Sequence, residues 1–453
     1  MHPSVLLQHH VQRRKFLQMT SAAAATGLSL STLTHLNLAA QSAPDYKALV
    51  CIFLFGGNDG NNLPVPLDNT RFAQYQTLRT VLALPKANFL PINPSNTGSA
   101  VYGLHPAMAG LQTLFGQGKA ALVANVGPLA VPTTKAQWNA RSVPLPDNLF
   151  SHSDQQAQWQ SAIVDAPPRN GWGGRMMERL LAADATNRGY GVLSLAGGNV
   201  WETGDVNLAA YKVSSSGNFG FDFYSPGGSD PLSVAIAQTL GEARGHLLDQ
   251  AWIDVMGRSI ENQRVLTSAL NSTTLATAFP DTSLGRQLKM AARLIAARNQ
   301  LGLPRQCFFC SIGGFDTHGD DQIQRQNELL GEISAAATAF YAATEELVLA
   351  DKVTLFTASD FGRTGQSNGQ GSDHGWGNHH MVVGGAVKGG AVYGSYPSLV
   401  LGANDEIGNG NWLPSTAVDQ MGATLGKWFG AQSAINEVFP RLPNFDPDLG
   451  FMA

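Results

Sequence analysis

A polar stretch late in the chain carries a high density of acidic and imidazole side chains. It begins after the apolar run 353–356, which has the composition of a buried strand, and ends at a second apolar run, 381–383. The side chains there that could act in catalysis or bind a metal are Ser359, Asp360, Arg363, Asp373, His374, Asn378, His379 and His380. A long segment rich in Gly, Ser, Asn and Gln between two buried strands is usually functional. The alternative is a disordered surface loop with incidental histidines.

Two other apolar runs end in the same kind of turn. The run 46–55 leads through Gly-Gly-Asn to Asp59, and the run 305–312 leads through Gly-Gly-Phe to Asp316. The carboxyl ends of parallel strands lie at one edge of a sheet, where ligands bind. We therefore expect Asp59, Asp316 and Asp360 to share one site. Taken alone, the turn at Asp59 is also an ordinary Asn-Asp-Gly turn.

The expected site combines these three carboxylates with the imidazoles of His318, His374 and, as a further candidate, His380. Carboxylates cannot be gathered in one place without a compensating charge. We therefore expect one or two divalent metal ions. Carboxylate and imidazole ligands without thiolate favour zinc or manganese, and magnesium or calcium also fit. Two such ions about 4 Å apart can bind both the attacking and the leaving oxygen of a phosphoryl-type displacement.

A candidate nucleophile lies in the stretch Ser151-His152-Ser153-Asp154, where a loop enters a helical pattern. A hydroxyl group at a helix amino terminus meets free backbone N–H groups and the positive end of the helix dipole. Ser151 is therefore either a helix cap or a nucleophile facing an anionic substrate, with Ser153 as the substitute. The residues alone leave both readings open.

Alternating strands and helices must position these residues. Helical spacing recurs at 70–81, 105–115, 170–183, 323–350 and 414–429. Strands that alternate with helices indicate an α/β fold with a doubly wound, mostly parallel sheet and helices on both faces. The pattern of residues 190–230 predicts a small antiparallel β region outside the main sheet, and that of residues 231–301 predicts helices. We expect a single domain, 44–453, with a small inserted β/helical region around 190–280.

Composition and the amino terminus narrow the class of protein. The chain has 453 residues, a net charge of −4 and no basic stripe, so nucleic acid is not an expected partner. Gln12-Arg13-Arg14-Lys15-Phe16-Leu17 precedes a weakly hydrophobic run interrupted by Ser and Thr. This pattern predicts a twin-arginine export signal over residues 1–43, with the export machinery as a partner. We expect a periplasmic or extracellular protein without an integral membrane segment after cleavage.

Several motifs together resemble a known family. They are Gly56-Gly57-Asn58-Asp59-Gly60, Ser151-His152, Gly171-Trp172-Gly173-Gly174-Arg175, Phe315-Asp316-Thr317-His318-Gly319, Ser359-Asp360-Phe361-Gly362-Arg363 and Asp373-His374-Gly375-Trp376-Gly377-Asn378. They resemble a family of twin-arginine-exported bacterial proteins named only as a domain of unknown function (1501). That family is similar to the alkaline phosphatase and sulfatase superfamily.

The resemblance implies a bimetallic, alkaline-phosphatase-like α/β hydrolase with a hydroxyl nucleophile. It implies that the metal ligands are Asp59, Asp316, His318, Asp360 and His374, with Ser151 or Ser153 in the nucleophile region. Further metal or neighbouring positions would be His152, Asp373, Asn378 and His380. The chain departs from the pattern where Asp360 replaces the family's usual glutamate. Phe361 also stands where phosphatases place a histidine, and the sulfatase nucleophile motif is missing.

The function predicted from the sequence is metal-dependent hydrolysis of phosphate or sulfate esters, either small molecules or polysaccharides. Ser151 would attack the ester, and Arg363, with Arg175 as a lesser candidate, would hold anionic oxygens by a forked contact. The alternative for either arginine is a surface or capping charge. A different class of function is a secreted, non-catalytic binding protein on the same fold. A lipase-like esterase is disfavoured because no Gly-x-Ser-x-Gly elbow surrounds Ser151.

Overall fold

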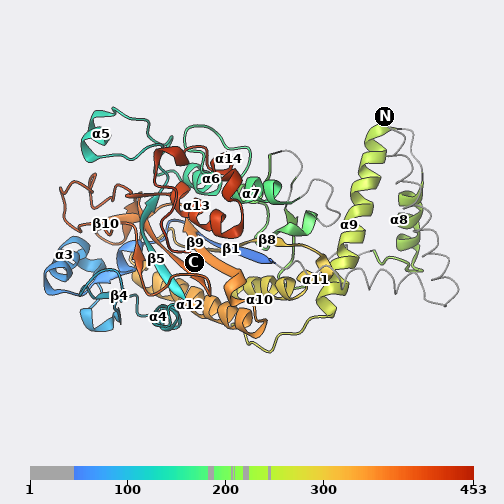
Figure 1. Cartoon of the computed structure of the whole chain (residues 1–453), viewed down its shortest axis with the longest axis horizontal. Helices are drawn as coiled ribbons and strands as arrows, with labels where there is room; N and C mark the ends of the chain where they lie inside the picture. The colour runs from blue at the N-terminus through green and yellow to red at the C-terminus, as the bar shows by residue number, and fades with distance from the viewer. Residues whose placement is uncertain (1–44, 182–187, 206–207, 209, 218–223, 243–245) are drawn as a thin grey trace, which may run out of the picture.

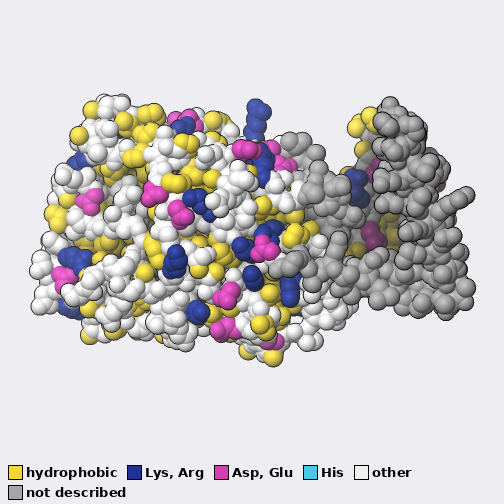
Figure 2. Space-filling model, viewed as in Figure 1, with side chains coloured by type: hydrophobic (Ala, Val, Ile, Leu, Met, Phe, Trp, Pro, Cys, Tyr) yellow, Lys and Arg dark blue, Asp and Glu magenta, His cyan; other side chains and the backbone are white. Residues whose placement is uncertain are grey.

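The computed structural model describes residues 45–453 except 182–187, 206–207, 209, 218–223 and 243–245. The predicted export signal, residues 1–43, lies outside the described residues. Within them, no helix has both the length and the hydrophobicity needed to span a bilayer. On the face shown in Figure 2, acidic and basic side chains of the described residues are interspersed.

Three parallel strands form the centre of the main sheet. β1 (Lys47–Phe55) lies between β8 (Arg305–Gly313) and β9 (Val353–Ser359) and pairs with both in parallel. Their apolar sequences follow from this position, because both faces of a central parallel strand are covered by helices. All three strands point toward the same edge, where the turns with the candidate residues begin.

The sheet extends on both sides in the order β13-β5-β12-β9-β1-β8-β6-β7, with β14 also paired to β5. Only β12 (Asn378–Gly384) pairs antiparallel with its neighbours among the described strands of this sheet. The other members are β5 (Ala120–Gly127), β6 (Val192–Ser194), β7 (Tyr211–Lys212), β13 (Val392–Tyr393) and β14 (Thr416–Ala417). A mostly parallel sheet confirms the predicted α/β class.

Helices cover both faces of the sheet (Figure 1). One layer contains α6 (His152–Ser161), α7 (Trp172–Leu180), α13 (Val418–Phe429) and α14 (Ile435–Val438). The opposite layer contains α4 (Ala109–Gly116), α10 (Ser283–Ala296) and α12 (Gln322–Glu346). This arrangement confirms the predicted doubly wound layering and places α6 above the strand ends.

The remaining elements lie around this core. They are α3 (Asn69–Arg79), α5 (Lys135–Ala140), α8 (Pro231–Gly241), α9 (Leu247–Asn271), α11 (Arg298–Leu301) and a small sheet of β2 (Val65–Pro66), β4 (Tyr102–Leu104) and β3 (Leu90–Ile92). In Figure 1, α8 and α9 project from the right-hand side of the molecule, on the side of the sheet where β8 lies. The prediction that residues 44–453 form a single domain with an insertion around 190–280 stays a prediction.

Two local predictions are wrong. β6 and β7 are not an antiparallel β region outside the main sheet; they join the main sheet in parallel, because the connection 195–210 is long enough for a crossover. The polar stretch after β9 is not one continuous loop, because it folds into the antiparallel pair β10 (Arg363–Ser367) and β11 (Ser372–His374). This pair turns His374 back toward the strand ends.

The buried carboxyl of Asp419, in the first turn of α13, predicts a pH-dependent stability. Its two oxygens have no hydrogen-bond partner among the described residues, and burial raises its pKa from 3.8 to about 7. Between these values the unfolded chain releases a proton that the folded chain keeps, so the free energy of unfolding falls as pH rises. The full drop is roughly 4 kcal/mol. Asp419→Asn should flatten this dependence in urea titrations at pH 4, 5.5 and 8, and an unchanged slope would contradict it.

Candidate metal centre

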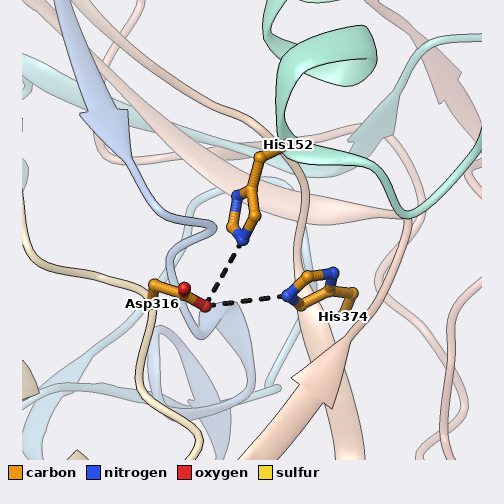
Figure 3. A group of neighbouring side chains, drawn as sticks. All are labelled: His152, Asp316 and His374. Atoms are coloured by element: carbon orange, nitrogen blue, oxygen red, sulfur yellow. Dashed lines mark ion pairs between the residues drawn. The ribbon is translucent and has the colours of Figure 1, made fainter.

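Two imidazoles and a carboxylate meet at the edge where the central strands end (Figure 3). His152 begins α6, Asp316 follows β8 and His374 ends β11. Asp316 Oδ1 lies 3.4 Å from His152 Nε2 and 3.6 Å from His374 Nε2. In the described part of the chain, this is the group of His, Cys, Asp or Glu side chains whose ligand atoms are close enough to hold a metal ion. We call it the triad.

Glycine makes the approach of Asp316 to the first strand possible. Gly56, directly after β1, has a φ of +111°, and a Cβ there would lie 2.4 Å from the backbone nitrogen of Asp316. Any side chain at position 56 would therefore push the two strand-end turns apart. The glycine that the sequence places after β1 is thus required by the close packing of the turn that carries Asp316.

The tautomer of His152 is set by Asp360. Asp360 Oδ2 lies 2.6 Å from His152 Nδ1 and also accepts hydrogen bonds from Gly56 N and Gln156 Nε2. This hydrogen bond raises the pKa of His152 against the opposing effect of burial. With the proton on Nδ1, the neutral ring presents the lone pair of Nε2 to Asp316. That nitrogen is buried and has no hydrogen-bond partner within the described residues. A histidine oriented by a carboxylate is the usual arrangement at metal sites.

His374 is oriented in the same sense. Its Nδ1 lies 2.7 Å from the carbonyl oxygen of Phe150, which can only accept, so the proton is on Nδ1 and the lone pair on Nε2. Burial, together with the charges of Arg363, His152 and His318, lowers the pKa of His374. The ring is therefore neutral and able to act as a ligand at neutral pH.

His318 lies beside the triad. Its Nε2 is 3.0 Å from both Asp316 Oδ1 and His374 Nε2, and it accepts a hydrogen bond from Arg363 at 3.1 Å. Because the Nε2 atoms of His318 and His374 both carry lone pairs in this arrangement, they repel each other unless a proton or cation lies between them. On its other side, His318 Nδ1 is 3.4 Å from Asp373 Oδ1.

The two distances to Asp316 match the spacing of ligands around a tetrahedral metal ion, and all three ligand atoms of the triad lie within 4.8 Å of one another. Zinc bonds of about 2.0–2.2 Å to nitrogen and oxygen place neighbouring ligand atoms about 3.3–3.6 Å apart. The separations from Asp316 Oδ1 to His152 and His374 are 3.4 and 3.6 Å. Burial opposes ionisation of Asp316, but the hydrogen bond and charge of Arg363 outweigh it and lower the pKa to about 2. The carboxylate is thus ionised throughout the physiological range.

Arg363 is not free to bind a substrate anion, contrary to the prediction. Its guanidinium donates to the carbonyl oxygens of Gly56, Gly57, Phe315 and Ser372 as well as to Asp316, and its side chain is buried. It ties the turns after β1 and β8 together. Arg175 is likewise excluded, because it is buried and donates to the carbonyl oxygens of Val438 and Ser161.

Asp59 is not in the centre either. Its Oδ2 accepts from Arg79 and from Gln322 at 2.6 Å, and its Oδ1 accepts twice from Asn61. Asp59 and Arg79 are both almost fully buried, so the carboxylate is neutralised by an arginine and not by a metal. Its role is to cap the short 3₁₀ turn Gly60–Asn62 and to anchor α3.

This assignment makes a prediction for Asp59→Asn. The variant leaves the guanidinium of Arg79 buried without its counter-charge, so we expect a loss of about 3–5 kcal/mol in the free energy of unfolding. Metal content per folded molecule should stay at the wild-type value. Urea unfolding and elemental analysis of the folded fraction measure both. If Asp59→Asn were as stable as the wild type but had lost its metal, Asp59 would be a metal ligand after all.

The other predicted positions divide into two groups. Asp373 lies against His318, as described above. Asn378 and His380 are in the interior: Asn378 Nδ2 donates to the carbonyl oxygens of Asn58 and Phe361, and His380 packs on the ring of Trp159. Burial lowers the pKa of His380 to about 3, so it is a neutral core residue. Asp360 acts through His152 and is not among the triad ligands, contrary to the prediction.

Ser151 stands at the amino terminus of α6, but its hydroxyl does not cap the helix. It donates to Asp154 Oδ2 at 2.5 Å and lies 3.2 Å from the hydroxyl of Ser153. The residues on either side of Ser151 belong to the centre, since the carbonyl of Phe150 orients His374 and His152 is a triad member. Of the two readings of the sequence, side-chain capping is therefore wrong, and the nucleophile reading stays a prediction.

Sequence reasoning gave two residues too little weight. The sequence predicts only a secondary role for His152, because nothing local shows that the start of α6 meets the strand ends. It predicts no role at the site for Phe361, yet the ring of Phe361 packs 4.7 Å from the ring of His152 and 4.5 Å from that of His374. The Ser-His pair at a helix start was the available signal for His152.

The fold and site define an α/β protein with a histidine–carboxylate triad, at the carboxyl edge of its sheet, that could hold a metal ion. The chain belongs to the family described as "Protein of unknown function (DUF1501)", which matches residues 46–433. No curated protein matches the sequence.

Three solved structures are similar at low identity. The PsFucS1 sulfatase from Pseudoalteromonas sp. is 10% identical, with 92% of this chain and 72% of that chain covered and a TM-score of 0.33. Ps i-CgsB in complex with k-i-k-neocarrahexaose is 9% identical, with 89% and 77% covered and a TM-score of 0.34. The lipoteichoic acid synthase LtaP from Listeria monocytogenes is 8% identical, with 72% and 61% covered and a TM-score of 0.27. At these TM-scores the likeness carries no argument about this chain.

Proposed function

We propose that the protein is a metal-dependent hydrolase of phosphate or sulfate esters. The observation that carries the proposal is the triad of His152, Asp316 and His374, in which hydrogen bonds fix both imidazoles with their lone pairs toward one ionised carboxylate. Two imidazoles and a carboxylate favour zinc or manganese over magnesium or calcium. A divalent ion held there would polarise an ester oxygen and lower the pKa of a hydroxyl group.

The residues around the triad suit an anionic substrate. α6 starts at His152, so the free N–H groups of its first turn and the positive end of its dipole lie beside the centre. Ser151 supplies the hydroxyl that would attack the ester, and Asp154 accepts its hydrogen bond and orients it. The hydrogen bonds from Ser151 and Asn148 lower the pKa of Asp154, which keeps this acceptor ionised. The rings of Phe361 and His152 pack together and shield one side of the centre from water.

The proposal is tested by metal analysis and an activity screen on the same preparation. Purified protein should contain about one equivalent of zinc or manganese, and it should hydrolyse at least one of 4-nitrophenyl phosphate, bis-(4-nitrophenyl) phosphate and 4-nitrophenyl sulfate. Activity should disappear with a chelator and return with the metal. Protein that binds the metal but hydrolyses none of these esters, or natural phosphate and sulfate esters, would overturn the proposal.

A second candidate is a non-catalytic binding protein that keeps the metal. The observation that favours it is the state of Arg363 and Arg175, which the sequence suggested as anion ligands but which are occupied by backbone carbonyls. Such a protein would bind phosphate or sulfate esters without turnover, so calorimetric binding without product formation would identify it.

We also propose export through the twin-arginine machinery, which would deliver the protein to the periplasm or the extracellular space. The support is the Arg13-Arg14 pair followed by a weakly hydrophobic run. Changing both arginines to lysine should keep the precursor in the cytoplasm, as measured by immunoblots of fractionated cells. Unchanged export of that variant would overturn this assignment.

A further inference from the structure

A cleft of about 500 Å³ runs along α6 next to the triad. Many of its lining residues have polar side chains, which come from α6, from the segment 198–203 and from β7, but apolar atoms make up the larger part of its surface. Its lining residues include Phe55, Ser153, Gln156, Arg169, Glu202 and Lys212.

The cleft and the candidate metal centre share a wall. Gln156 lines the cleft and donates to Asp360 Oδ2 at 2.8 Å, the same oxygen that orients His152. Phe55 lies at the end of β1, immediately before the glycine whose N–H also contacts Asp360. Ser153 lines the cleft and lies 3.2 Å from the hydroxyl of Ser151. An ester placed at the centre would therefore extend its alcohol part into this cleft.

Glu202 gives the cleft an unused polar group. Its side chain is 1% exposed, and its Oε2 is buried without a hydrogen-bond partner among the residues described. Burial raises its pKa to about 7, with weaker opposing hydrogen bonds from Ser194 and Asn199. The carboxyl is thus partly protonated near neutral pH, and its protonated form carries an O–H donor. A buried polar group without a partner is destabilising, and a hydrogen bond to a ligand oxygen would offset that cost.

The charge of the lining favours anions. Arg169 and Lys212 are cationic, and Glu202 is the acidic residue of the lining. With that carboxyl protonated, the cleft carries two positive charges and no negative charge from its lining side chains. Amide and hydroxyl groups such as those of Gln156 and Ser153 complete a surface suited to oxygen-rich ligands.

We propose that this cleft is a second anion-binding subsite, which selects esters whose alcohol part bears hydroxyl groups and at least one further phosphate, sulfate or carboxylate. Arg169 and Lys212 contact the additional anionic group, and Glu202 donates a hydrogen bond to a ligand oxygen. The inference deepens the proposed function and rests on it for the identity of the ligand as a substrate. The binding of the polyanion can be measured without turnover.

The test compares binding of inositol hexakisphosphate and of inorganic phosphate by calorimetry, with the metal-loaded protein at pH 6.5. Lys212→Met should weaken the binding of inositol hexakisphosphate about tenfold, in line with the loss of one charged contact of about 1.4 kcal/mol. It should leave inorganic phosphate within twofold. Lys388→Met removes an exposed lysine outside the cleft lining and serves as the matched control.

Variants of Glu202 test the second contact of the proposed subsite. Glu202→Gln keeps an N–H donor and should bind inositol hexakisphosphate as wild type does, whereas Glu202→Leu should bind it at least fivefold more weakly. The subsite is overturned if inositol hexakisphosphate binds no more tightly than inorganic phosphate, or if Lys388→Met weakens it as much as Lys212→Met. If the variants behave as expected while no ester is hydrolysed, the subsite stands and the hydrolase proposal fails. Hydrolysis of simple aryl esters without polyanion binding would overturn the subsite and support the hydrolase proposal.

Discussion

Asp316→Ala is expected to lose the bound metal and about 10³-fold in kcat/KM, equivalent to roughly 4 kcal/mol of transition-state stabilisation. Asp316 Oδ1 is the atom on which His152, His318 and His374 converge, and its carboxylate is the anionic member of the triad. Without it, two neutral imidazoles remain, and a divalent ion loses the charge that holds it most strongly. Elemental analysis and steady-state kinetics on the best ester from the screen measure both effects.

The control for this variant is Asp320→Asn, which changes an exposed acid close to Asp316 in the sequence that is not a member of the triad. It should keep its metal and stay within about twofold of wild-type activity, because surface substitutions of this kind are nearly neutral. Asp316→Asn adds a finer comparison, since an amide oxygen can still ligate without the charge. If Asp316→Ala kept its full metal content and full turnover, the triad would be neither the metal site nor required for hydrolysis.

Ser151→Ala has the second largest expected effect, a fall in kcat of about 10⁴-fold with metal content unchanged. The Ser151 hydroxyl is free of a capping role, is oriented by Asp154, and lies between two residues that contact the centre. Mass spectrometry of quenched wild-type reactions should detect a phosphoryl or sulfuryl group on the peptide that contains Ser151.

Ser153→Ala is the matched comparison, because its hydroxyl lies 3.2 Å from that of Ser151 and shares the contact with Asp154. It should lose less than about tenfold in kcat if Ser151 is the nucleophile. A larger loss in Ser153→Ala would transfer the role to Ser153. Full activity in both variants, with no modified peptide, would mean that water attacks the ester directly.

The central strands could be predicted because their burial in the middle of the sheet requires apolar residues, which are visible in the local sequence. β1, β8 and β9 are covered on both faces, so each contains a run of apolar residues that marks it as a buried strand. The rule that parallel strands end at one edge then predicted that Asp316 and Asp360 would lie near each other, and both contact His152. The same rule failed for Asp59, although its strand and turn have the same pattern.

The failures share a physical cause, which is a partner from a distant segment. Arg79 reaches Asp59 from α3 and neutralises it, and backbone carbonyls from two turns occupy Arg363. Neither partner can be recognised from the residues beside Asp59 or Arg363. His152 was undervalued for the same reason, because its place in the centre depends on how α6 docks above the sheet. The local sequence therefore predicts which edge of the sheet carries the site, but it does not predict which side chains at that edge form the triad.

The hydrogen bond between Asp360 and His152 joins the end of β9 to the first residue of α6, two segments about two hundred positions apart. The triad therefore exists only once the helical layer has settled on the finished sheet, and a partly folded chain offers no equivalent pocket for an ion. If the triad binds a metal ion, binding should occur late in folding, and the bound ion should stabilise the packing of the helical layer on the sheet. Release of the ion would then be an early step of unfolding, in which the helical layer separates from the sheet.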